Sequence, residues 1–439
     1  MSLLRQLVAQ LEDIFYLYGS VNNPFHLQLP CPRWCAPNED DDGTDKYCGF
    51  MIADDFDTSK ICKSPPSKKC KIEYNDDKMD EDDGAMIVMH EELWKQLPED
   101  LLEAVVARLP ITSFFRFRSV CRKWNSLPNS LSFSKHFAEA TKTQPWFYIT
   151  YRNIHGGAAY DPSSMKWHQL GIPTFPARAL VQPVASAGGL LCLLDIGDHI
   201  FYICNPLNKS YKELPIPARS VKSRLPMAVG MAFNRGGYSV LWVTSDGDYN
   251  VYDSKKNSWA HPGSMPANIK LPLSLNFISQ TISVNNIIYL TRDDPEGIIS
   301  YDASSGEWKQ YIIPSPVYLS HHTLAECDGR IMLAGLVSKN AATCLCVWEL
   351  QRMTLLWKEV DRMPNIWCLD FYGKHVNMTS LGNKGSLLLC LTCQHTNLLV
   401  TYNLNTREWV KIPVHTFGCC KGQFIARGAA FYPCITSLP

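Results

Sequence analysis

The histidine and cysteine residues of this chain are the side chains whose types and spacing could bind a metal ion. The closest groupings are Cys31 with Cys35, Cys390 with Cys393 and His395, Cys419 with Cys420, and His321 with His322. A zinc site needs four convergent ligands, normally as two spaced pairs, and no second pair stands at a suitable distance. Adjacent histidines rarely converge on one metal ion, so we interpret the His321 pair as part of a surface loop before a strand. The sequence therefore predicts no metal site and no cofactor.

Motifs of the common catalytic classes are absent from the sequence as well. The chain has no Gly-rich phosphate loop, no Gly-x-Ser-x-Gly nucleophile turn and no His-Glu-x-x-His helix. His155-Gly156-Gly157 is typical of a turn rather than of an oxyanion site. We therefore predict no catalytic residue, and we expect the chain to act by binding.

The composition favours a protein that folds around large apolar cores. The chain has 439 residues, of which 46% are hydrophobic and 19% charged, and its formal net charge is zero. The length suggests two or three domains, and the neutrality argues against bulk binding of nucleic acid. No apolar run reaches the roughly 20 residues of a membrane span, so we expect neither a signal peptide nor a membrane partner. The 17 scattered cysteines fit a reducing compartment, which predicts a location in the nucleus, the cytoplasm or both.

Two segments at the start of the chain differ in composition from the rest. Residues 1–19 place their apolar side chains on one face of an amphipathic helix of about five turns. That face either packs on the globular part or pairs with a partner, and the sequence leaves both open. Residues 30–89 are rich in Asp, Glu, Lys, Pro and Ser and bury too little apolar surface to offset the entropy of ordering, which predicts a disordered acidic linker. We interpret its short basic cluster after Ser64 as solvated charge, with phosphorylation and nuclear import as alternatives.

The segment from 97 to 127 has the most informative pattern in the chain. A first apolar set recurs at helical spacing after Pro98, and Pro110 stops that helix. A second apolar set runs from Phe114 to Trp124, with basic residues on the remaining faces. With one further helix it makes a small all-α unit at 91–140. Because about 40 residues cannot bury a self-sufficient core, the spare apolar surface predicts a partner.

The order of these residues resembles the F-box, the helical module that docks on a Skp-family adaptor of cullin-RING ubiquitin ligases. By that resemblance the adaptor-binding residues are Leu97, Pro98, Leu101, Leu102, Leu109, Pro110, Phe117, Val120, Cys121 and Trp124. Phe114-Phe115 departs from the pattern, where a smaller aliphatic residue is more usual, and this could change the preference among adaptors. The alternative is an ordinary helical hairpin packed on its own domain.

A repeat occupies the chain after about residue 145. Short apolar runs typical of strands recur at 190–194, 240–243, 287–290, 331–337 and 386–391. Six shorter blocks recur among them, and we place their anchors at Asp161, Asn205, Asp253, Asp302, Glu349 and Asn403. An aromatic residue lies six residues beyond an Asp or Asn in five of the blocks. The Asp or Asn is expected to close a tight turn, and the aromatic side chains to pack between neighbouring sheets.

A period of about 50 residues with a Tyr-Asp to Trp hairpin resembles the kelch repeat, whose unit is one four-stranded blade of a β-propeller. Six copies imply an all-β six-bladed kelch-type propeller over 145–439. Gly188-Gly189 and Gly236-Gly237 match the kelch double glycine, whereas Asn285-Asn286, Asp328-Gly329 and Lys384-Gly385 depart from it. Residues 428–435 resemble the opening strand of a blade without a hairpin of its own. We therefore predict that this C-terminal strand completes the first blade and closes the ring.

An F-box beside kelch repeats is similar to the large class of plant F-box/kelch-repeat proteins. The resemblance implies a substrate-recognition subunit of an SCF (Skp, cullin, F-box) ubiquitin ligase. Its partners would be the Skp-family adaptor, a cullin, a RING subunit and a protein substrate on one propeller face. Residues of the predicted interblade loops that could line this face are Arg178, Arg224, Arg292, His321 and Arg427. The alternatives are a propeller scaffold without a ligase role and a kelch-fold metal oxidase with copper bound by His and Tyr.

Overall fold

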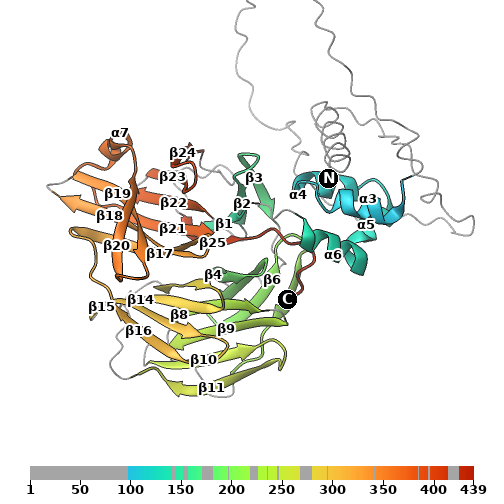
Figure 1. Ribbon diagram of the computed structural model, residues 1–439, viewed down its shortest axis with the longest axis horizontal. Coiled ribbons are helices and arrows are strands. Elements are labelled where there is room, and N and C mark those ends of the chain that lie inside the picture. Colours follow the sequence, from blue (N-terminus) through green and yellow to red (C-terminus); the bar gives the residue numbers. More distant parts are fainter. Residues whose placement is uncertain are drawn as a thin grey trace, which may run out of the picture. The chain divides into compact units, whose positions relative to one another are not determined.

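The computed structural model describes residues 97–140, 144–151, 157–170, 181–195, 197–217, 226–234, 236–244, 247–266, 279–293, 295–339, 342–383, 385–393, 396–413 and 425–439. They belong to two compact units that divide between Thr141 and Lys142, a helical unit and a β-propeller, both drawn in Figure 1. The predicted helix at 1–19 and the predicted linker at 30–89 lie outside the described residues. Within these stretches no helix has the length and apolar character needed to cross a bilayer.

The described part of the helical unit consists of short helices whose ends follow from the local sequence. These are α3 (Glu99–Val106), α4 (Ile111–Arg118), α5 (Arg122–Ser126), the 3-10 turn η2 (Leu127–Asn129) and α6 (Leu131–Glu139). Pro98 and Pro110 stand immediately before α3 and α4, where a fixed backbone angle and a missing N–H cost nothing. The Cys121 sulfur accepts the Trp124 amide at 3.5 Å before α5, and the Ser130 hydroxyl caps α6 in the same way.

Stacked aromatic rings form the centre of the helical unit. The rings of Phe117 and Trp124 lie 3.8 Å apart between centroids, and those of Phe114 and Phe133 lie 5.5 Å apart. None of these four side chains is more than 5% exposed. Phe114, which departs from the expected smaller residue, therefore packs against α6 inside the unit. Such ring pairs contribute about 1 kcal/mol each beyond the apolar area they bury.

The propeller contains six sheets, or blades, within the described residues, as the repeat predicts. Blade one has β25 (Ile425–Phe431), β1 (Trp146–Tyr151), β2 (Gly157–Asp161) and β3 (Lys166–Leu170); blade two has β4 (Val181–Ala187), β5 (Leu190–Asp195), β6 (Ile200–Asn205) and β7 (Ser210–Glu213); blade three has β8 (Pro226–Asn234), β9 (Gly237–Thr244), β10 (Asp248–Asp253) and β11 (Ser258–Ser264), with β12 (Ser279–Gln280) parallel to β8. Blade four has β13 (Ile282–Val284), β14 (Ile287–Asp293), β15 (Glu296–Asp302) and β16 (Trp308–Ile312); blade five has β17 (Leu319–Cys327), β18 (Arg330–Lys339), β19 (Ala342–Gln351) and β20 (Leu356–Arg362); blade six has β21 (Asn377–Asn383), β22 (Ser386–Cys393), β23 (Thr396–Asn403) and β24 (Glu408–Ile412).

One connection between blades is helical. Between β20 and β21 the chain forms α7 (Asn365–Cys368) and the 3-10 turn η3 (Leu369–Phe371). The all-β six-bladed propeller is confirmed, and this short helical segment is an addition that the sequence analysis did not anticipate. The cause is local, because Pro364 precedes α7 at its N-cap and fixes the backbone for a helix start.

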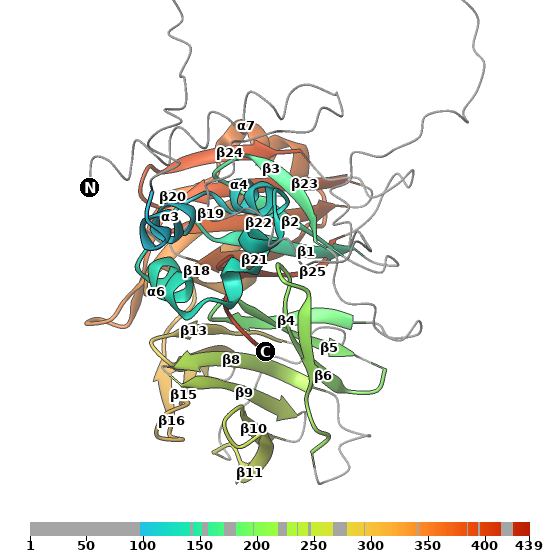
Figure 2. The same cartoon turned by 90° about the vertical axis from the view of Figure 1, so that its right-hand side faces the viewer.

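The C-terminal strand closes the ring within blade one, as predicted. Strand β25 pairs antiparallel with β1, with Phe147 opposite Ala430, and Figure 2 shows the two strands side by side. Blade one is thus built from both ends of the propeller sequence. The pairing supplies β1 with a partner that its edge would otherwise lack.

The repeated hairpins close through one side-chain hydrogen bond. In five blades the Oδ1 atom of an Asp or Asn accepts the amide hydrogen of the residue two positions on, as the anchors Asp161, Asn205, Asp253, Asp302 and Asn403 show. The residue four positions after each anchor has a positive φ, at Met165, Lys209, Asn257, Gly306 and Arg407. This is the Asx turn expected from the sequence, followed by a left-handed residue that turns the chain into the outer strand.

The anchor predicted for the fifth blade is wrong by two residues. Gln351 lies opposite Leu356, the register that Asp161 has with Lys166 in blade one, whereas Glu349 lies inside β19. With Gln351 as the anchor the spacings become 44, 48, 49, 49 and 52 residues, and an aromatic residue follows six positions later in all six blades. Blade five has Gln351 at the position where the other blades have Asp or Asn. The predicted anchor was therefore assigned to the nearby acidic residue, Glu349.

The turn between the first and second strands has the same left-handed backbone in blade four, where the double glycine is missing, as in blade two. Gly188 and Gly189 have φ values of 59° and 85°, and Asn285 and Asn286 have 49° and 70°. Asn tolerates the left-handed conformation better than other side chains, so it can replace glycine in a hairpin of this type. The kelch label itself stays a prediction.

The aromatic residues of the hairpins contact neighbouring blades, as predicted. The Trp259 indole of blade three donates to the Pro215 carbonyl beyond blade two at 2.6 Å, and the Trp409 indole of blade six donates to Asp361 of blade five at 3.3 Å. Trp167 of blade one reaches Pro413 beyond blade six at 2.9 Å. These bonds surround apolar cores that lie between adjacent sheets.

A closing segment, residues 432–439, crosses from blade one to blade two after β25. The Nδ2 atom of Asn205 donates to the carbonyl oxygens of Cys434 and Ser437 at 2.7 and 2.9 Å. The Ser437 hydroxyl donates to the Gly188 carbonyl at 2.6 Å. The closing segment therefore ties the last strand of the ring to its neighbouring blade, in addition to the β25 pairing.

Candidate functional site

The ten residues assigned to an adaptor divide into buried and accessible groups. Leu102, Leu109, Phe117 and Trp124 are between 0% and 5% exposed. They belong to the core of the helical unit, so the expectation that they form part of the contact surface is corrected. A side chain with no accessible surface shapes a docking surface by holding its helices in place.

The accessible residues lie at the starts of α3, α4 and α5. Leu101 is 41% exposed, and Pro98 and Pro110 are exposed as well. Leu97, Val120 and Cys121 are half-buried. We call these six residues the helical docking surface. They supply apolar contact area without any catalytic group.

Polar contacts hold α4 and α5 in the arrangement that forms the helical docking surface. The Arg118 guanidinium donates to the Asn125 Oδ1 atom from two nitrogens at 3.2 and 2.9 Å. The same guanidinium lies 5.8 Å from the ring centroids of Phe114 and Phe115, and burial lowers the pKa of Arg118. Lys123 on α5 pairs with Glu99 on α3 at 3.0 Å. The departure at Phe114-Phe115 is thus matched by a cation over both rings.

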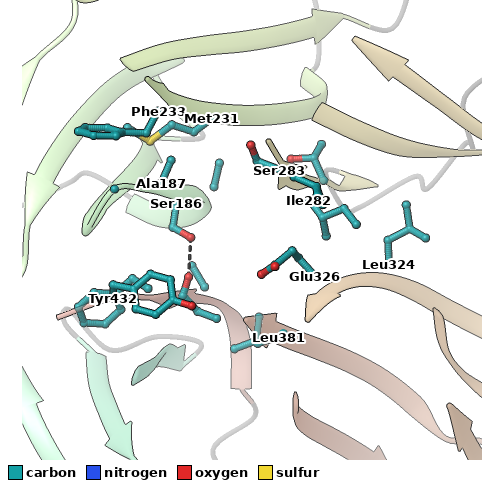
Figure 3. Close-up of a pocket in the computed structure, with 18 of the residues that line it drawn as sticks. Ser186, Ala187, Met231, Phe233, Ile282, Ser283, Leu324, Glu326, Leu381 and Tyr432 are labelled. Carbon is teal, nitrogen blue, oxygen red and sulfur yellow. Dashed lines mark hydrogen bonds between the residues drawn. The ribbon is translucent and has the colours of Figure 1, made fainter. Parts of the chain in front are cut away.

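The propeller encloses a central cavity of about 410 Å³ that is lined by the innermost strands of all six blades. Figure 3 shows Ser186, Ile282, Ser283 and Glu326 around it, and the Ser186 hydroxyl donates to the Ala430 carbonyl at 2.5 Å. The Glu326 carboxylate accepts the Gly329 amide hydrogen at 2.7 Å. Among the described lining residues there are carboxylates at Glu326 and Asp328 and no basic side chain.

The five predicted substrate-binding residues do not form one described surface. Arg178 and Arg224 lie outside the described residues, and Arg427 lies in β25 opposite Thr150. Arg292 lies in strand β14 rather than in a loop, is 4% exposed and donates to the Gln310 side chain at 2.7 Å. The expectation that Arg292 lines an accessible rim is therefore corrected, because its strand continues further than the apolar run that predicted it.

His321 also lies in a strand and not in the predicted loop. It belongs to β17, where it stands opposite Leu336, and its ring lies edge-on to His375 with 5.7 Å between centroids. Burial, together with the nearby His375 ring, lowers the pKa of His321. The residue is exposed and lies at the end of blade five where interblade segments enter.

The cysteine side chains of the described residues are free thiols. Burial raises the pKa of Cys390 to about 11 and that of Cys204 to about 12. A reactive cysteine needs the opposite shift, so these side chains act as small apolar residues. No group of three or more His, Cys, Asp or Glu side chains in the described stretches is placed to hold a metal ion.

Sequence reasoning missed one accessible surface, the helical segment between blades five and six. Ile366, Leu369 and Tyr372 are 72%, 69% and 60% exposed. Their spacing of three residues and the preceding Pro364 were the available signal, since residues three apart align along a 3-10 turn. The run was missed because a single helical turn is too short for a periodicity to be recognised.

Two family models match the sequence over the two units. The F-box domain model matches residues 94–136, and the model described as "F-box protein At3g26010-like, beta-propeller" matches residues 170–423. The second match covers more than half of the chain.

Relatives of this chain are found among plant proteins. The chain is 48% identical to F-box only protein 6 of Arabidopsis thaliana, over 100% of this chain and 99% of that protein. It is 24% identical to Protein UNUSUAL FLORAL ORGANS of Arabidopsis thaliana over 73% of this chain and 79% of that protein. It is 25% identical to F-box/kelch-repeat protein At3g61590 of the same organism over 71% of this chain and 82% of that protein.

Proposed function

The chain belongs to the family of F-box proteins that carry a β-propeller, and from this we propose that it is the substrate-recognition subunit of an SCF ubiquitin ligase. The observation that carries the proposal is the presence of an F-box and a closed propeller on one chain. The F-box binds the Skp-family adaptor, and through it the cullin and RING subunits. The propeller binds the protein to be ubiquitinated.

The helical docking surface supports the adaptor half of the proposal. Leu101, Pro98 and Pro110 offer accessible apolar area. Stacked rings hold α4 against α5 and α6, and the Lys123–Glu99 ion pair joins α5 to α3. A preorganised surface loses little side-chain entropy when it docks, so more of the contact energy appears as affinity.

The proposed activity requires no reactive group in this chain. A receptor that holds a substrate lysine near a ubiquitin-charged enzyme raises the effective concentration of the two reactants. F-box proteins with a propeller generally recruit substrates and are not enzymes themselves. We propose the same non-catalytic role for this chain. We further propose that the protein works in the nucleus, the cytoplasm or both, where its many thiols remain reduced.

Co-purification with a Skp-family adaptor tests the proposal. Full-length protein is expected to retain the adaptor on size exclusion, and Leu101→Glu is expected to lose it because a carboxylate would enter an apolar contact. Leu131→Glu is the matched control, since Leu131 is 83% exposed and lies outside the ten predicted adaptor residues. Circular dichroism checks that both variants keep their helices.

The proposal fails if the unmodified chain does not bind the adaptor, or if Leu101→Glu binds it as well as Leu131→Glu does. A positive result is extended by adding cullin, RING subunit, ubiquitin and charging enzymes. Ubiquitin transfer to the chain or to proteins bound by it should then depend on Leu101.

A further inference from the structure

The segment α7–η3 is anchored on the propeller by one side and leaves the other side free. Met363 and Phe371 are 1% and 4% exposed within the apolar core between blades five and six. Trp367 and Cys368 pack against the same core, and the Cys368 thiol donates to the Met363 carbonyl at 3.8 Å. The segment is therefore held in place by its own side chains.

The outward side of the segment carries a row of apolar side chains. Ile366, Leu369 and Tyr372, spaced by three residues, are 72%, 69% and 60% exposed. We call these three residues the apolar ridge. An exposed row of large apolar side chains on an anchored segment marks an interaction surface rather than a scattered exposure.

A second accessible pair lies at the same end of the ring. Val317 and Tyr318 are 73% and 56% exposed and precede β17, just as the apolar ridge precedes β21. Both stretches lead into an innermost strand, so they open at the same end of their blades. The rings of His321 and His375, one from each stretch, meet at 5.7 Å and join the two.

Three lysines and one carboxylate make the charged contacts described next, at the border of this surface. Lys411 lies with its Nζ atom 4.8 Å from the Trp367 ring centroid and 4.0 Å from an Asp370 carboxylate oxygen. Lys374 donates to the Asp370 carbonyl at 2.9 Å, and Lys339 lies 5.0 Å from the Tyr318 ring centroid. Asp370 is the one carboxylate among these contacts, so the charge that complements the border is negative.

We propose that the apolar ridge is the substrate-docking surface of this receptor, and that it binds a short segment in which apolar side chains alternate with Asp or Glu. This inference rests on the proposed function and names the kind of partner that the propeller accepts. Apolar side chains of the bound segment cover Ile366, Leu369 and Tyr372. Its carboxylates meet Lys374, Lys411 and Lys339 at the border.

Peptide selection on the full-length chain bound to its adaptor tests the inference. A phage-displayed library of random short peptides, counter-selected on the variant Ile366→Ser with Leu369→Ser, is expected to enrich Leu, Ile or Phe beside Asp or Glu. One enriched peptide is then synthesised, and its affinity is measured by fluorescence anisotropy. The double variant should weaken it by about tenfold or more, because two apolar contacts are lost.

Two further variants separate the contributions. Lys374→Glu should weaken the same peptide severalfold, and added salt should reduce that difference, since border charges are screened. Met353→Ser with Leu356→Ser is the matched control, because Met353 and Leu356 are 97% and 52% exposed on the outer hairpin of blade five, away from the apolar ridge in sequence. That control should leave the affinity unchanged, and thermal unfolding should be equal for all variants.

Several outcomes would overturn the inference. The first is that no peptide binds the unmodified chain better than it binds the ridge variant, Ile366→Ser with Leu369→Ser. The second is that the selected peptides are basic. The third is that the ridge variant and the Met353→Ser with Leu356→Ser control bind the peptide equally. A change from dimer to monomer in light scattering of the ridge variant would also overturn it, because the occupant would then be a second copy. Loss of the adaptor from the unmodified chain would instead reject the proposed function, and peptide binding to the ridge would be unaffected.

Discussion

The two ends of the propeller ring differ in how regular they are. At one end, which we call the hairpin end, the outer hairpins repeat one Asx turn in five blades and the closing segment bonds to two of the turns in blade two. At the opposite end, the interblade end, the two fully described connections are unlike each other, a loop at 313–318 and the helical segment at 363–376. At the hairpin end, the repeated Asx turn serves closure of the ring. At the interblade end, the helical connection that departs from the repeat provides a surface for another molecule.

The largest expected loss of stability comes from a substitution that removes the hydrogen bonds between Asn205 and the closing segment at the hairpin end. Asn205→Asp keeps the Oδ1 acceptor for the Leu207 amide but replaces the Nδ2 donor, so two carbonyl oxygens face a carboxylate at a site with no accessible surface. We expect a loss of about 3 kcal/mol in the free energy of unfolding, measured by urea titration with tryptophan fluorescence.

Asn403→Asp is the matched control for that prediction. Asn403 closes the same turn in blade six, with its Oδ1 atom accepting the Asn405 amide at 2.9 Å. Because Asp occupies this position in three other blades, the control should change stability by less than about 0.5 kcal/mol. Equal losses for the two variants would show that the closing segment contributes nothing.

A smaller effect is expected where the closing segment crosses a turn of blade two. A Cβ atom on Gly189 would lie 2.5 Å from the Cβ atom of Cys434, at a φ of 85°. Gly329 has a φ of 75° and open space around its missing Cβ, so it carries the backbone cost alone. Gly189→Ala should cost about 2 kcal/mol and Gly329→Ala about 1 kcal/mol in thermal unfolding. A reversed order would argue against tight packing of the closing segment.

A stabilising change should follow from completing the hairpin pattern in blade one. Met165 has a φ of 53° and is 69% exposed, so its side chain adds strain without burial. Met165→Asn should raise the free energy of unfolding by about 1 kcal/mol, because Asn accepts the left-handed conformation. Met353→Asn, at a fully accessible position that lacks a positive φ, should have no effect in the same urea titration.

The smallest stability effect is expected at the interblade end. Ile366→Ser should change the free energy of unfolding by less than about 0.5 kcal/mol, because the side chain is 72% exposed. The same variant should weaken peptide binding, whereas Asn205→Asp should leave the affinity of the remaining folded protein unchanged. A large stability loss at Ile366 would remove the distinction between the two ends.

Local features of the fold could be predicted from the sequence. Asp161, Asp253 and Asp302 each close a turn with residues two positions away, so a short pattern in the chain specifies the hairpin. The fifth anchor was misplaced because Gln351 replaces the usual Asp or Asn and Glu349 stood nearby. The closing strand was predictable because 428–435 resemble other opening strands in composition.

Features that depend on distant contacts could not be predicted in the same way. Asn205 bonds to Cys434 across 229 positions of sequence, and nothing near Asn205 indicates that its Nδ2 atom is used. The burial of individual side chains could not be predicted either. Arg292 was expected on an accessible rim, but it is buried and donates a hydrogen bond to the Gln310 side chain. The adaptor residues were found as a set, but only packing separates Leu101 on the surface from Leu102 in the core.

The pairing of β25 with β1 has a consequence for how the protein is made. A ribosome releases residues 146–151 early and residues 425–431 late, so blade one has no complete sheet until translation of the propeller is nearly over. A nonsense change that falls within the propeller, after residue 142 and before residue 425, therefore leaves the helical unit intact and the ring without the strand that closes it. Under the proposed function, such a product would occupy the adaptor without presenting a substrate, so truncating alleles should act dominantly over the intact copy.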